Sequence, residues 1–412
     1  MTRPAASTIE VPLAPPARRA LHADAQRFSV RIHADVDALP ACWPRSGAPG
    51  EARCHVFQTV EFLKVWVETF ARAGKARPFF VEVRDLEGAL AMLVPFALWR
   101  RFGARILTFA DDGAADYNAP ALFPTTWDWT PRNAAEAWRA IKTALPRFDV
   151  ALFDKMPATV GGIVNPLHLL STGENTESTH ATDLRRPWAE VEKGQVFYGK
   201  RMRRIASIEE TTPVRMEIAQ DRASRDRILA ALLEQKQRRF EETRVPGFDA
   251  QPEKRDFYVR ATDAMAQAGA LHLSALVFGE EIVAAQWSLV HGGRYYALVG
   301  SFDPTTYARY SPGKVLYLML LKRLHEDGIE IADLGVGDEA YKMDHCDLHF
   351  RLTVLTEAET VMGRLFLARA DGMRRLRASP LWRRLRPLKW VVLRKLRREP
   401  EPKGASGPED AA

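Results

Sequence analysis

The order of helices and strands predicted by hydrophobic periodicity repeats along this chain, and the repeat limits the folds open to it. In each half, helical sequence precedes three short apolar strands joined by tight turns, and a helix and a further strand follow. The strands are expected at 78–83, 89–97 and 105–109, and again at 270–278, 281–290 and 294–302. This order predicts two α/β units, each with an antiparallel-rich mixed sheet, rather than one continuous parallel sheet.

Composition and periodicity divide the 412 residues into segments that agree with two units. The expected segments are a disordered lead-in at 1–27, an N-terminal unit at 28–160, a linker at 161–196, a C-terminal unit at 197–363, a basic amphipathic helical tail at 364–398 and a disordered end at 399–412. Both ends are assigned from their lack of periodicity. The linker is assigned from its polar, turn-rich composition.

Positive charge is concentrated in the predicted tail. The formal net charge of the chain is +7, yet 364–399 alone holds 13 Lys and Arg against 2 Asp and Glu. Apolar residues recur there at three- and four-residue steps, such as Leu381, Leu385 and Leu388, with arginines between them. Two interpretations stay open: the tail lies on the anionic inner-membrane surface, or its apolar face packs on the second unit.

Cysteine content and apolar runs favour a cytoplasmic protein that is at most peripheral at the inner membrane. The three cysteines are too few and too scattered for a disulfide framework or a cysteine-based zinc site. No apolar core of a secretory signal stands near the first residues. The longest apolar run, 89–98, is too short to span a bilayer.

The most informative stretch is Tyr310-Ser-Pro-Gly-Lys314, which opens a helix. Free N–H groups at a helix start attract anions, and Lys314 adds positive charge. Gly313 allows a ligand to approach the backbone closely. Tyr310, Ser311, Gly313 and Lys314 are therefore the candidates for holding the pyrophosphate of a nucleotide-type cofactor. The alternative is an ordinary helix start with a turn before it.

A second stretch, Asp333-Leu-Gly-Val-Gly-Asp-Glu-Ala-Tyr-Lys342, follows the last predicted strand of the second half. Ligands favour the carboxyl ends of strands in α/β folds. Carboxylates can act as a general base, while tyrosine or lysine can donate a proton or hold an anion. Asp338, Glu339, Tyr341 and Lys342 are the catalytic candidates, and a solvated polar loop is the alternative.

Substrate-binding candidates come from both halves. Gln286 and Ser288 form a polar pair on one face of the strand 281–290, where they line a groove or a solvated sheet face. Asp116 and Tyr117 belong to an acidic loop that could bind an amine or sugar acceptor if it faces the second unit. A merely solvated loop is the alternative.

No metal is expected. The acidic loop would need a convergence of Asp111, Asp112 and Asp116 that sequence does not establish. His345-Cys346-Asp347 with His349 matches no zinc signature.

The Asp-Tyr loop, the meander, the Tyr-Ser-Pro-Gly helix start and the Asp-Leu-Gly-x-Gly-Asp-Glu-x-Tyr-Lys stretch follow one another in order. This succession resembles the GNAT-type acyltransferases of the BioF-like/CelD group, which are related to the FemAB peptidyltransferases. The resemblance covers 28–363, most firmly 197–356. It implies two GNAT-like folds in tandem, with the more recognisable acyl-CoA-type site in the second.

One departure from the family pattern leaves the donor open. A single-domain GNAT holds pyrophosphate on an Arg/Gln-x-x-Gly-x-Gly/Ala loop, whereas Tyr310–Lys314 lacks that glycine spacing. Acetyl-CoA, a longer acyl-CoA and an aminoacyl-tRNA, as in the FemAB relatives, all stay candidates.

The resemblance implies an acyltransferase acting on a cell-envelope or exopolysaccharide precursor, with a small-molecule or saccharide acceptor. Backbone N–H groups of the central strands would polarise the donor thioester. Asp338 or Glu339 would accept the acceptor's proton, Tyr341 would protonate the leaving thiolate or position the acceptor, and Lys342 would hold an acidic group. The alternatives are a catalytically degenerate scaffold or regulator in a polysaccharide-synthesis complex, and a FemAB-like aminoacyl transferase. A nucleic-acid-binding module is not expected, because no zinc finger or RNP motif is found and the basic tail, on which binding would rest, carries no aromatic stacking platform.

Overall fold

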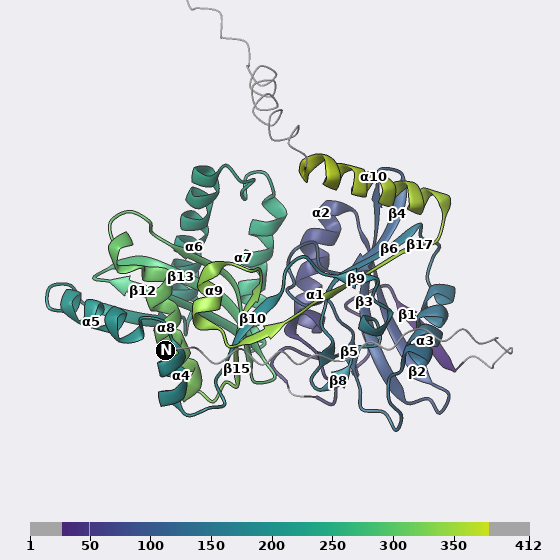
Figure 1. Cartoon of the computed structure of the whole chain (residues 1–412), viewed down its shortest axis with the longest axis horizontal. Helices are drawn as coiled ribbons and strands as arrows, with labels where there is room; N and C mark the ends of the chain where they lie inside the picture. The colour runs from purple at the N-terminus through teal and green to yellow at the C-terminus, as the bar shows by residue number, and fades with distance from the viewer. Residues whose placement is uncertain (1–26, 49, 379–412) are drawn as a thin grey trace, which may run out of the picture.

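The computed structural model describes residues 27–48 and 50–378. Two α/β units lie side by side, each built on a mixed sheet with helices packed against it (Figure 1). The strands of the first unit run in the order β1-β2-β3-β4-β6-β17-β9, with β5 paired to β3. Those of the second run β11-β12-β13-β14-β15-β10-β16.

The strands of the first sheet are β1 (Phe28–His33), β2 (Arg77–Asp85), β3 (Leu90–Arg101), β4 (Ala104–Phe109), β5 (Ala121–Leu122), β6 (Val150–Met156), β9 (Gly173–Glu174) and β17 (Thr353–Ala358). Those of the second are β10 (Thr179–Asp183), β11 (Val214–Ile218), β12 (Leu271–Phe278), β13 (Glu281–His291), β14 (Arg294–Phe302), β15 (Ile331–Val336) and β16 (Leu348–Phe350). A separate ribbon pairs β7 (Thr159–Val160) with β8 (Ile163–Val164).

The helices are α1 (Val60–Trp66), continued by η2 (Val67–Ala71) and α2 (Arg72–Gly74), then α3 (Pro131–Ala144), α4 (Trp188–Gly194), α5 (Tyr198–Glu209), α6 (Arg222–Thr243), α7 (Pro252–Gln267), α8 (Pro312–Glu326), α9 (Ala340–His345) and α10 (Val361–Ala378). Short turns of helix lie at η1 (Val56–Gln58), η3 (His168–Leu170) and η4 (Ala308–Tyr310).

Local sequence fixes where several helices begin and end. Thr130 accepts a hydrogen bond from the Asn133 N–H at the start of α3, and Asp221 does the same with the Ser224 N–H at the start of α6. Each such cap satisfies backbone donors that the first helical turn leaves free. After α7 and α8, Gly269 and Gly328 adopt left-handed φ values of 68° and 75°, which glycine reaches without steric cost.

The two units repeat one topology, as the sequence predicts. In the first, β2, β3 and β4 form an antiparallel meander, α3 follows, and β6 pairs parallel with β4. In the second, β12, β13 and β14 form the meander, α8 follows, and β15 pairs parallel with β14. The predicted α/β class, with two tandem units of the same topology, is therefore confirmed.

The first sheet takes one strand from the far end of the chain, which the sequence did not indicate. β17 follows β15 and β16, yet it pairs with β6 of the first sheet. The second sheet is made from one stretch of chain, 179–350. The segment 161–196, expected as a linker, contributes β10 to it as an inner strand, paired with β15. The first sheet thus combines strands from both sides of the second sheet in the sequence.

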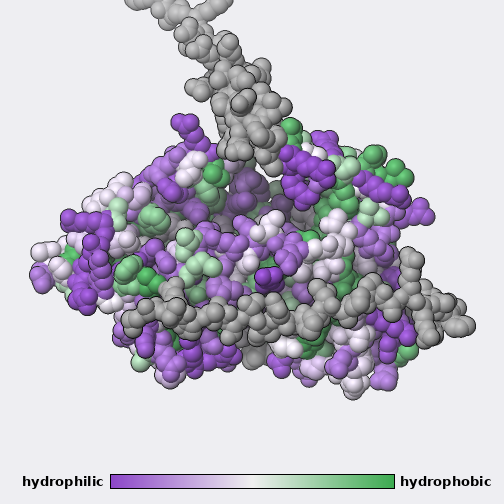
Figure 2. Space-filling model, viewed as in Figure 1, coloured by the Kyte–Doolittle hydropathy of each residue, from purple (hydrophilic) through white to green (hydrophobic). Residues whose placement is uncertain are grey.

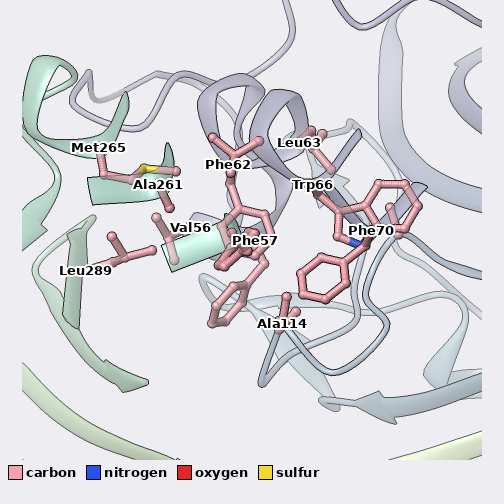
Figure 3. Packing of buried hydrophobic residues seen from close by; sticks show 14 of the residues in the cluster. Val56, Phe57, Phe62, Leu63, Trp66, Phe70, Ala114, Ala261, Met265 and Leu289 are labelled. Carbon is pink, nitrogen blue, oxygen red and sulfur yellow. The ribbon is translucent and has the colours of Figure 1, made fainter. Parts of the chain in front are cut away.

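Hydrophobic packing also joins the units. Figure 3 shows Val56, Phe57 and Phe62 of the first unit packed with Ala261 and Leu289 of the second, in one buried cluster. The Phe62 ring meets the Phe257 ring edge-on, 5.5 Å between centroids. Full burial of one such side chain stabilises the fold by about 1.5–3 kcal/mol, so the shared cluster couples the stabilities of the two units.

The first part of the predicted tail is helical and packs on the first unit. α10 contacts β4 and β17, and its Phe366 and Leu367 pack against the shared core. The expectation that the tail's apolar face packs on the second unit is wrong for this part. The remainder of the tail, the expected lead-in at 1–26 and the expected end at 399–412 lie outside the described residues.

We predict that the full chain unfolds in one cooperative transition. The return of β17 to the first sheet and the shared core make each unit's stability depend on the other. Scanning calorimetry should give equal calorimetric and van't Hoff enthalpies. Two resolved transitions would contradict the coupling.

Candidate functional site

A buried charge on β15 of the second sheet joins the two units. Asp333 on β15 is fully buried and accepts hydrogen bonds from the Tyr117 hydroxyl at 2.6 Å and from Arg294 at 2.8 Å. Tyr117 comes from the first unit, and Arg294 opens β14. Burial and the Asp333 charge raise the pKa of Tyr117 well above its usual value, so its hydroxyl stays a donor. The aspartate therefore fixes the first unit's loop against β14 and β15.

An aromatic stack extends this junction. The His55 ring lies flat against the Tyr117 ring, 4.2 Å between centroids, and its Nδ1 is 3.1 Å from the Tyr296 hydroxyl. Burial, assisted by the charge of Arg294, lowers the pKa of His55, so the imidazole is neutral. Within the described residues, His55 Nε2 has no hydrogen-bond partner.

Beyond this junction β14 and β15 separate. Their pairing ends at Tyr296 and Asp333, although β14 continues to Phe302 and β15 to Val336. A register shift opposite Trp287 bends β14 in the same region. Past the last pair, the two strands no longer hydrogen-bond to each other.

Asp116 of the first unit reaches the carboxyl end of β15. It accepts a hydrogen bond from the Val336 N–H. A Cβ on Gly335 would lie 2.3 Å from Asp116 Oδ2, so only glycine leaves room for this approach. Gly335 also has a left-handed φ of 71°, which glycine tolerates best. The sequence-based candidate Asp116 thus lies where the two strands separate.

The surroundings of Asp116 tune its acidity. Burial raises its pKa to about 7, and the nearby Asp333 charge adds to the rise, while Lys155 and Lys342 oppose it. A carboxyl group with this pKa exists in both protonation states near neutral pH, which suits proton transfer.

Further polar side chains interact electrostatically with Asp116. Burial raises the pKa of Tyr258 on α7 and raises that of Tyr341 to about 12, and the charge of Asp116 adds to both rises. The charge of Glu339 acts on Tyr341 and on Lys236 of α6, whose Nζ lies 3.4 Å from the Gly300 carbonyl on β14. We call Asp116, Lys236, Tyr258, Glu339 and Tyr341 the junction site.

Lys342 has a structural position rather than the anion-binding position expected for it. Its side chain is buried, and Nζ donates to the carbonyls of Gly335 and Val336 at 3.2 and 2.8 Å. The same ammonium pairs with Glu339 at 3.0 Å. Because these three acceptors match its three donors, Lys342 holds the strand end in place.

Asp338 points toward a histidine pair. Its Oδ1 lies 2.8 Å from His180 Nε2, and His180 Nδ1 lies 2.7 Å from His349 Nδ1. The hydrogen bond from His180 lowers the pKa of Asp338 below its usual value. Asp338 is therefore a weaker base than Asp116. Asp338 is half exposed, and His180 on β10 is buried.

The start of α8 lies beside α9. Lys314 Nζ is 4.0 Å from Asp344 Oδ2, which brings Ser311–Lys314 close to the segment that carries Glu339 and Tyr341. Ser311 has a left-handed φ of 54°, and a Cβ on Gly313 would approach the Phe302 ring at 3.3 Å. Tyr310 packs on Phe278, with ring centroids 6.1 Å apart.

Three substrate-binding candidates make contacts within the chain. Ser288 is fully buried, and its hydroxyl donates to the Tyr295 hydroxyl at 2.7 Å. Tyr117 is buried in the junction with Asp333. The Gln286 amide donates to the Trp287 carbonyl, and its Oε1 lies next to Gly300. The alternation of side chains along β13 predicted which of its faces is polar. It could not show that helix α8 covers this face.

The part of the chain that is described contains no group of three or more His, Cys, Asp or Glu residues that could hold a metal ion. His345 instead places Nδ1 3.0 Å from the Gln195 side-chain oxygen.

The sequence did not identify four residues of the junction and its surroundings, namely Lys236, Tyr258, Arg294 and Asp333. Lys236 and Tyr258 stand in strongly helical sequence, where a charged or aromatic residue carries no signal of function. Arg294 opens a predicted strand. Only the distance between chain segments reveals that they meet.

A comparison with known protein families finds a match in the second unit. Residues 199–343 match the family described as the acetyltransferase (GNAT) domain. No curated protein sequence matches the chain. The match confirms the GNAT resemblance predicted from the motifs.

Solved structures of similar topology have low sequence identity. FemX is 10% identical with a TM-score of 0.49, over 73% of this chain and 92% of FemX. The L-PGS of Bacillus licheniformis is 13% identical with a TM-score of 0.44, over 79% and 96%. A tandem GNAT protein from the clavulanic acid biosynthesis pathway is 11% identical with a TM-score of 0.41, over 80% and 98%.

We predict that Arg294→Met lowers the free energy of unfolding by about 3–5 kcal/mol, because it leaves the buried Asp333 charge without its cation. Urea unfolding followed by circular dichroism measures the loss. Arg323→Met is the control, because Arg323 pairs with Asp327 on an exposed helix face, and it should cost no more than about 0.5 kcal/mol. Equal losses would show that Asp333 does not depend on Arg294.

Proposed function

We propose, from the premise that residues 199–343 form a GNAT domain, that this protein is an acyltransferase whose reaction centre is the junction site. The observation that carries the proposal is the position of Asp116. This carboxylate comes from the first unit and meets the end of β15, where β14 and β15 separate in the GNAT domain. Both units therefore contribute to one site.

The chemistry assigned to the site is proton transfer coupled to acyl transfer. Asp116 takes a proton from the acceptor's amine or hydroxyl, which then attacks the carbonyl carbon of the donor thioester. Backbone N–H groups of β14 beyond Tyr296, where its pairing with β15 has ended, stabilise the oxyanion that forms. As the carbon–sulfur bond breaks, the leaving thiolate receives a proton from Tyr341, whose pKa near 12 keeps it protonated.

This assignment moves two roles from where the sequence put them. The general base becomes Asp116, because its pKa is raised to about 7, whereas the His180 hydrogen bond lowers that of Asp338. The group that would bind an acidic part of the acceptor becomes Lys236, because Lys342 is already saturated by three acceptors. Glu339 stays at the site, beside Lys236 and Tyr341.

The proposed donor is acetyl-CoA or another acyl-CoA. The N-terminal turn of α8, with Lys314, supplies the partial and full positive charge that a pyrophosphate requires. Its approach to α9 places that turn close to the junction site. A saccharide or other cell-envelope precursor with a free amine or hydroxyl is the proposed acceptor class, following the resemblance to the BioF-like/CelD group.

An aminoacyl-tRNA donor is the second candidate, and α5 is the observation that favours it. This helix is basic and exposed at Lys200, Arg203 and Arg204, and Arg204 donates to the Arg309 carbonyl next to the start of α8. Phe197, 62% exposed, stands at the start of α5. Cations beside an exposed aromatic ring suit a single-stranded nucleic acid end.

We predict that coenzyme A raises the melting temperature of the full chain by about 2–5 °C at concentrations well above its dissociation constant, because a ligand that binds only the folded state stabilises it by mass action. Differential scanning fluorimetry with coenzyme A or with total tRNA measures the shift. Lys314→Gln should reduce the shift, while Lys322→Gln, on an exposed position of α8, should not.

A shift in melting temperature with tRNA and none with coenzyme A would favour aminoacyl-tRNA over acyl-CoA as the donor. The absence of both shifts would support the alternative of a degenerate scaffold.

We predict that Asp116→Asn lowers kcat/KM by about 10²–10⁴-fold, because the amide cannot accept the proton. Thiol release from an acyl-CoA over a panel of amino sugars measures it. In the unsubstituted protein, kcat/KM should rise with pH up to about 7, as Asp116 ionises, and then level off. The variant should lose this rise.

Asp112→Asn is the matched control, because Asp112 lies in the same loop but pairs with Arg101 at the surface. Stability provides the second control. Since the pKa of Asp116 is raised by folding, the native state loses stability as the pH rises from about 4 through 7, and Asp116→Asn should reduce that loss. An active Asp116→Asn variant with an unchanged pH profile would refute the assignment.

A further inference from the structure

Helix α10 is fixed on the first unit by one face only. An added Cβ on Gly363 would lie 1.8 Å from the Asp149 carbonyl oxygen, so the helix backbone rests directly on the start of β6. The Thr360 hydroxyl donates to the Asp149 carboxylate at 2.9 Å, and Phe366 and Leu367 pack into the core. The helix therefore has a fixed orientation.

The remaining surface of α10 is hydrophobic where a solvated helix would be polar. Val361 is 67% exposed and Leu365 is 60% exposed, and Met362 and Met373 are also exposed. Met362, Leu365, Arg369 and Met373 follow at three- and four-residue steps, which places them on one face. Figure 2 shows hydrophobic residues among hydrophilic ones over the upper right of the molecule, where α10 lies in Figure 1.

The neighbouring β3–β4 turn extends this face with an unusual residue. Phe102 and Gly103 form the two-residue turn, and both have positive φ, 52° and 82°. Such turns favour asparagine, aspartate or glycine at the first position. Phenylalanine strains that backbone and leaves its ring 71% exposed. The turn and the core do not call for a phenylalanine here, and most of its ring is left open to a contact from outside the chain.

Cations surround these hydrophobic side chains. The Arg369 guanidinium lies 4.0 Å from the centroid of the Phe102 ring, which connects the helix to the turn. Arg364, Arg374 and Arg375 stand on the same helix, and Asp371 is its single acidic residue. We call Phe102, Val361, Met362, Leu365, Arg369 and Met373 the α10 face.

We propose that the α10 face binds the surface of an anionic lipid bilayer. Hydrophobic side chains with arginines beside them fit the boundary between lipid headgroups and acyl chains, where Phe102 and Leu365 enter and the guanidinium groups meet phosphates. This inference concerns a surface separate from the junction site, so it does not depend on the proposed function. In the described residues no helix is long and apolar enough to cross a membrane, and the contact proposed is peripheral.

Repulsion between positive charges argues against two other partners that could cover the α10 face. A second copy of the chain would bring arginines of one α10 face against those of the other. The chain beyond α10 would do the same, because residues 379–398 hold eight Lys and Arg and no Asp or Glu. That sequence instead has the same character as the α10 face, with Trp382 and Trp390 among its cations, so both can engage one anionic surface.

The test is flotation of the full chain with vesicles of phosphatidylcholine alone or with 30% phosphatidylglycerol, at low and high salt. We expect binding to the anionic vesicles at low salt that falls at least fivefold at high salt. The double variant Phe102→Asn/Leu365→Gln should reduce binding at least fivefold, while an unchanged melting temperature shows that it is folded. Asparagine suits the turn conformation, so the fold should tolerate the change.

Leu86→Gln is the matched control, because Leu86 is 69% exposed in the β2–β3 turn of the same unit, and its binding should stay unchanged. Equal binding by the double variant and the unsubstituted chain would overturn the proposal, as would equal binding to both vesicle types or no binding at all. A dimer in light scattering that the double variant dissociates would assign the face to a second copy instead.

Discussion

The buried carboxylate of Asp333 is the interaction on which the arrangement of the two units depends. A charge without solvent is stable only when cations and donors surround it, and here they come from both units, as Arg294 and the Tyr117 hydroxyl. Satisfying Asp333 brings the 111–118 loop of the first unit against β15. That contact in turn brings Asp116 to Gly335, at the point where β14 and β15 separate. The candidate reaction centre is thus a consequence of how one buried charge is neutralised.

The return of β17 to the first sheet makes this arrangement cooperative. This strand follows the second unit in the chain and completes the sheet of the first. The hydrophobic cluster that includes Phe62 and Phe257 crosses the same boundary. A site shared between two domains would normally open and close with their relative motion, because interfaces within a chain are small and polar. Here the hydrogen-bonded strands and the common core hold Asp116 and the GNAT domain in one geometry, as proton transfer requires.

The α10 face follows from the same architecture. Because β17 completes the first sheet, the helix that follows it lies on the first unit, beside the β3–β4 turn. This places the exposed hydrophobic residues of α10 next to Phe102, which is more than two hundred residues away in the sequence. Neither segment alone would suggest a surface for lipid, since single exposed hydrophobic residues are common. Their alignment, with arginines around both, creates one.

The sequence by itself determined the local elements and their order, because hydrophobic periodicity, caps and tight turns act over a few residues. It therefore predicted the two meanders, the helices that follow them and the candidates Asp116, Glu339 and Tyr341. Only the tertiary structure decided which segments meet. It paired β17 with β6 across the units, made β10 an inner strand of the second sheet, buried Tyr117 and Ser288, and saturated Lys342. It also brought Tyr258 within reach of the charge of Asp116 and Lys236 within reach of that of Glu339. Those outcomes depend on contacts between residues up to hundreds of positions apart, and such contacts leave no periodic trace in a single sequence.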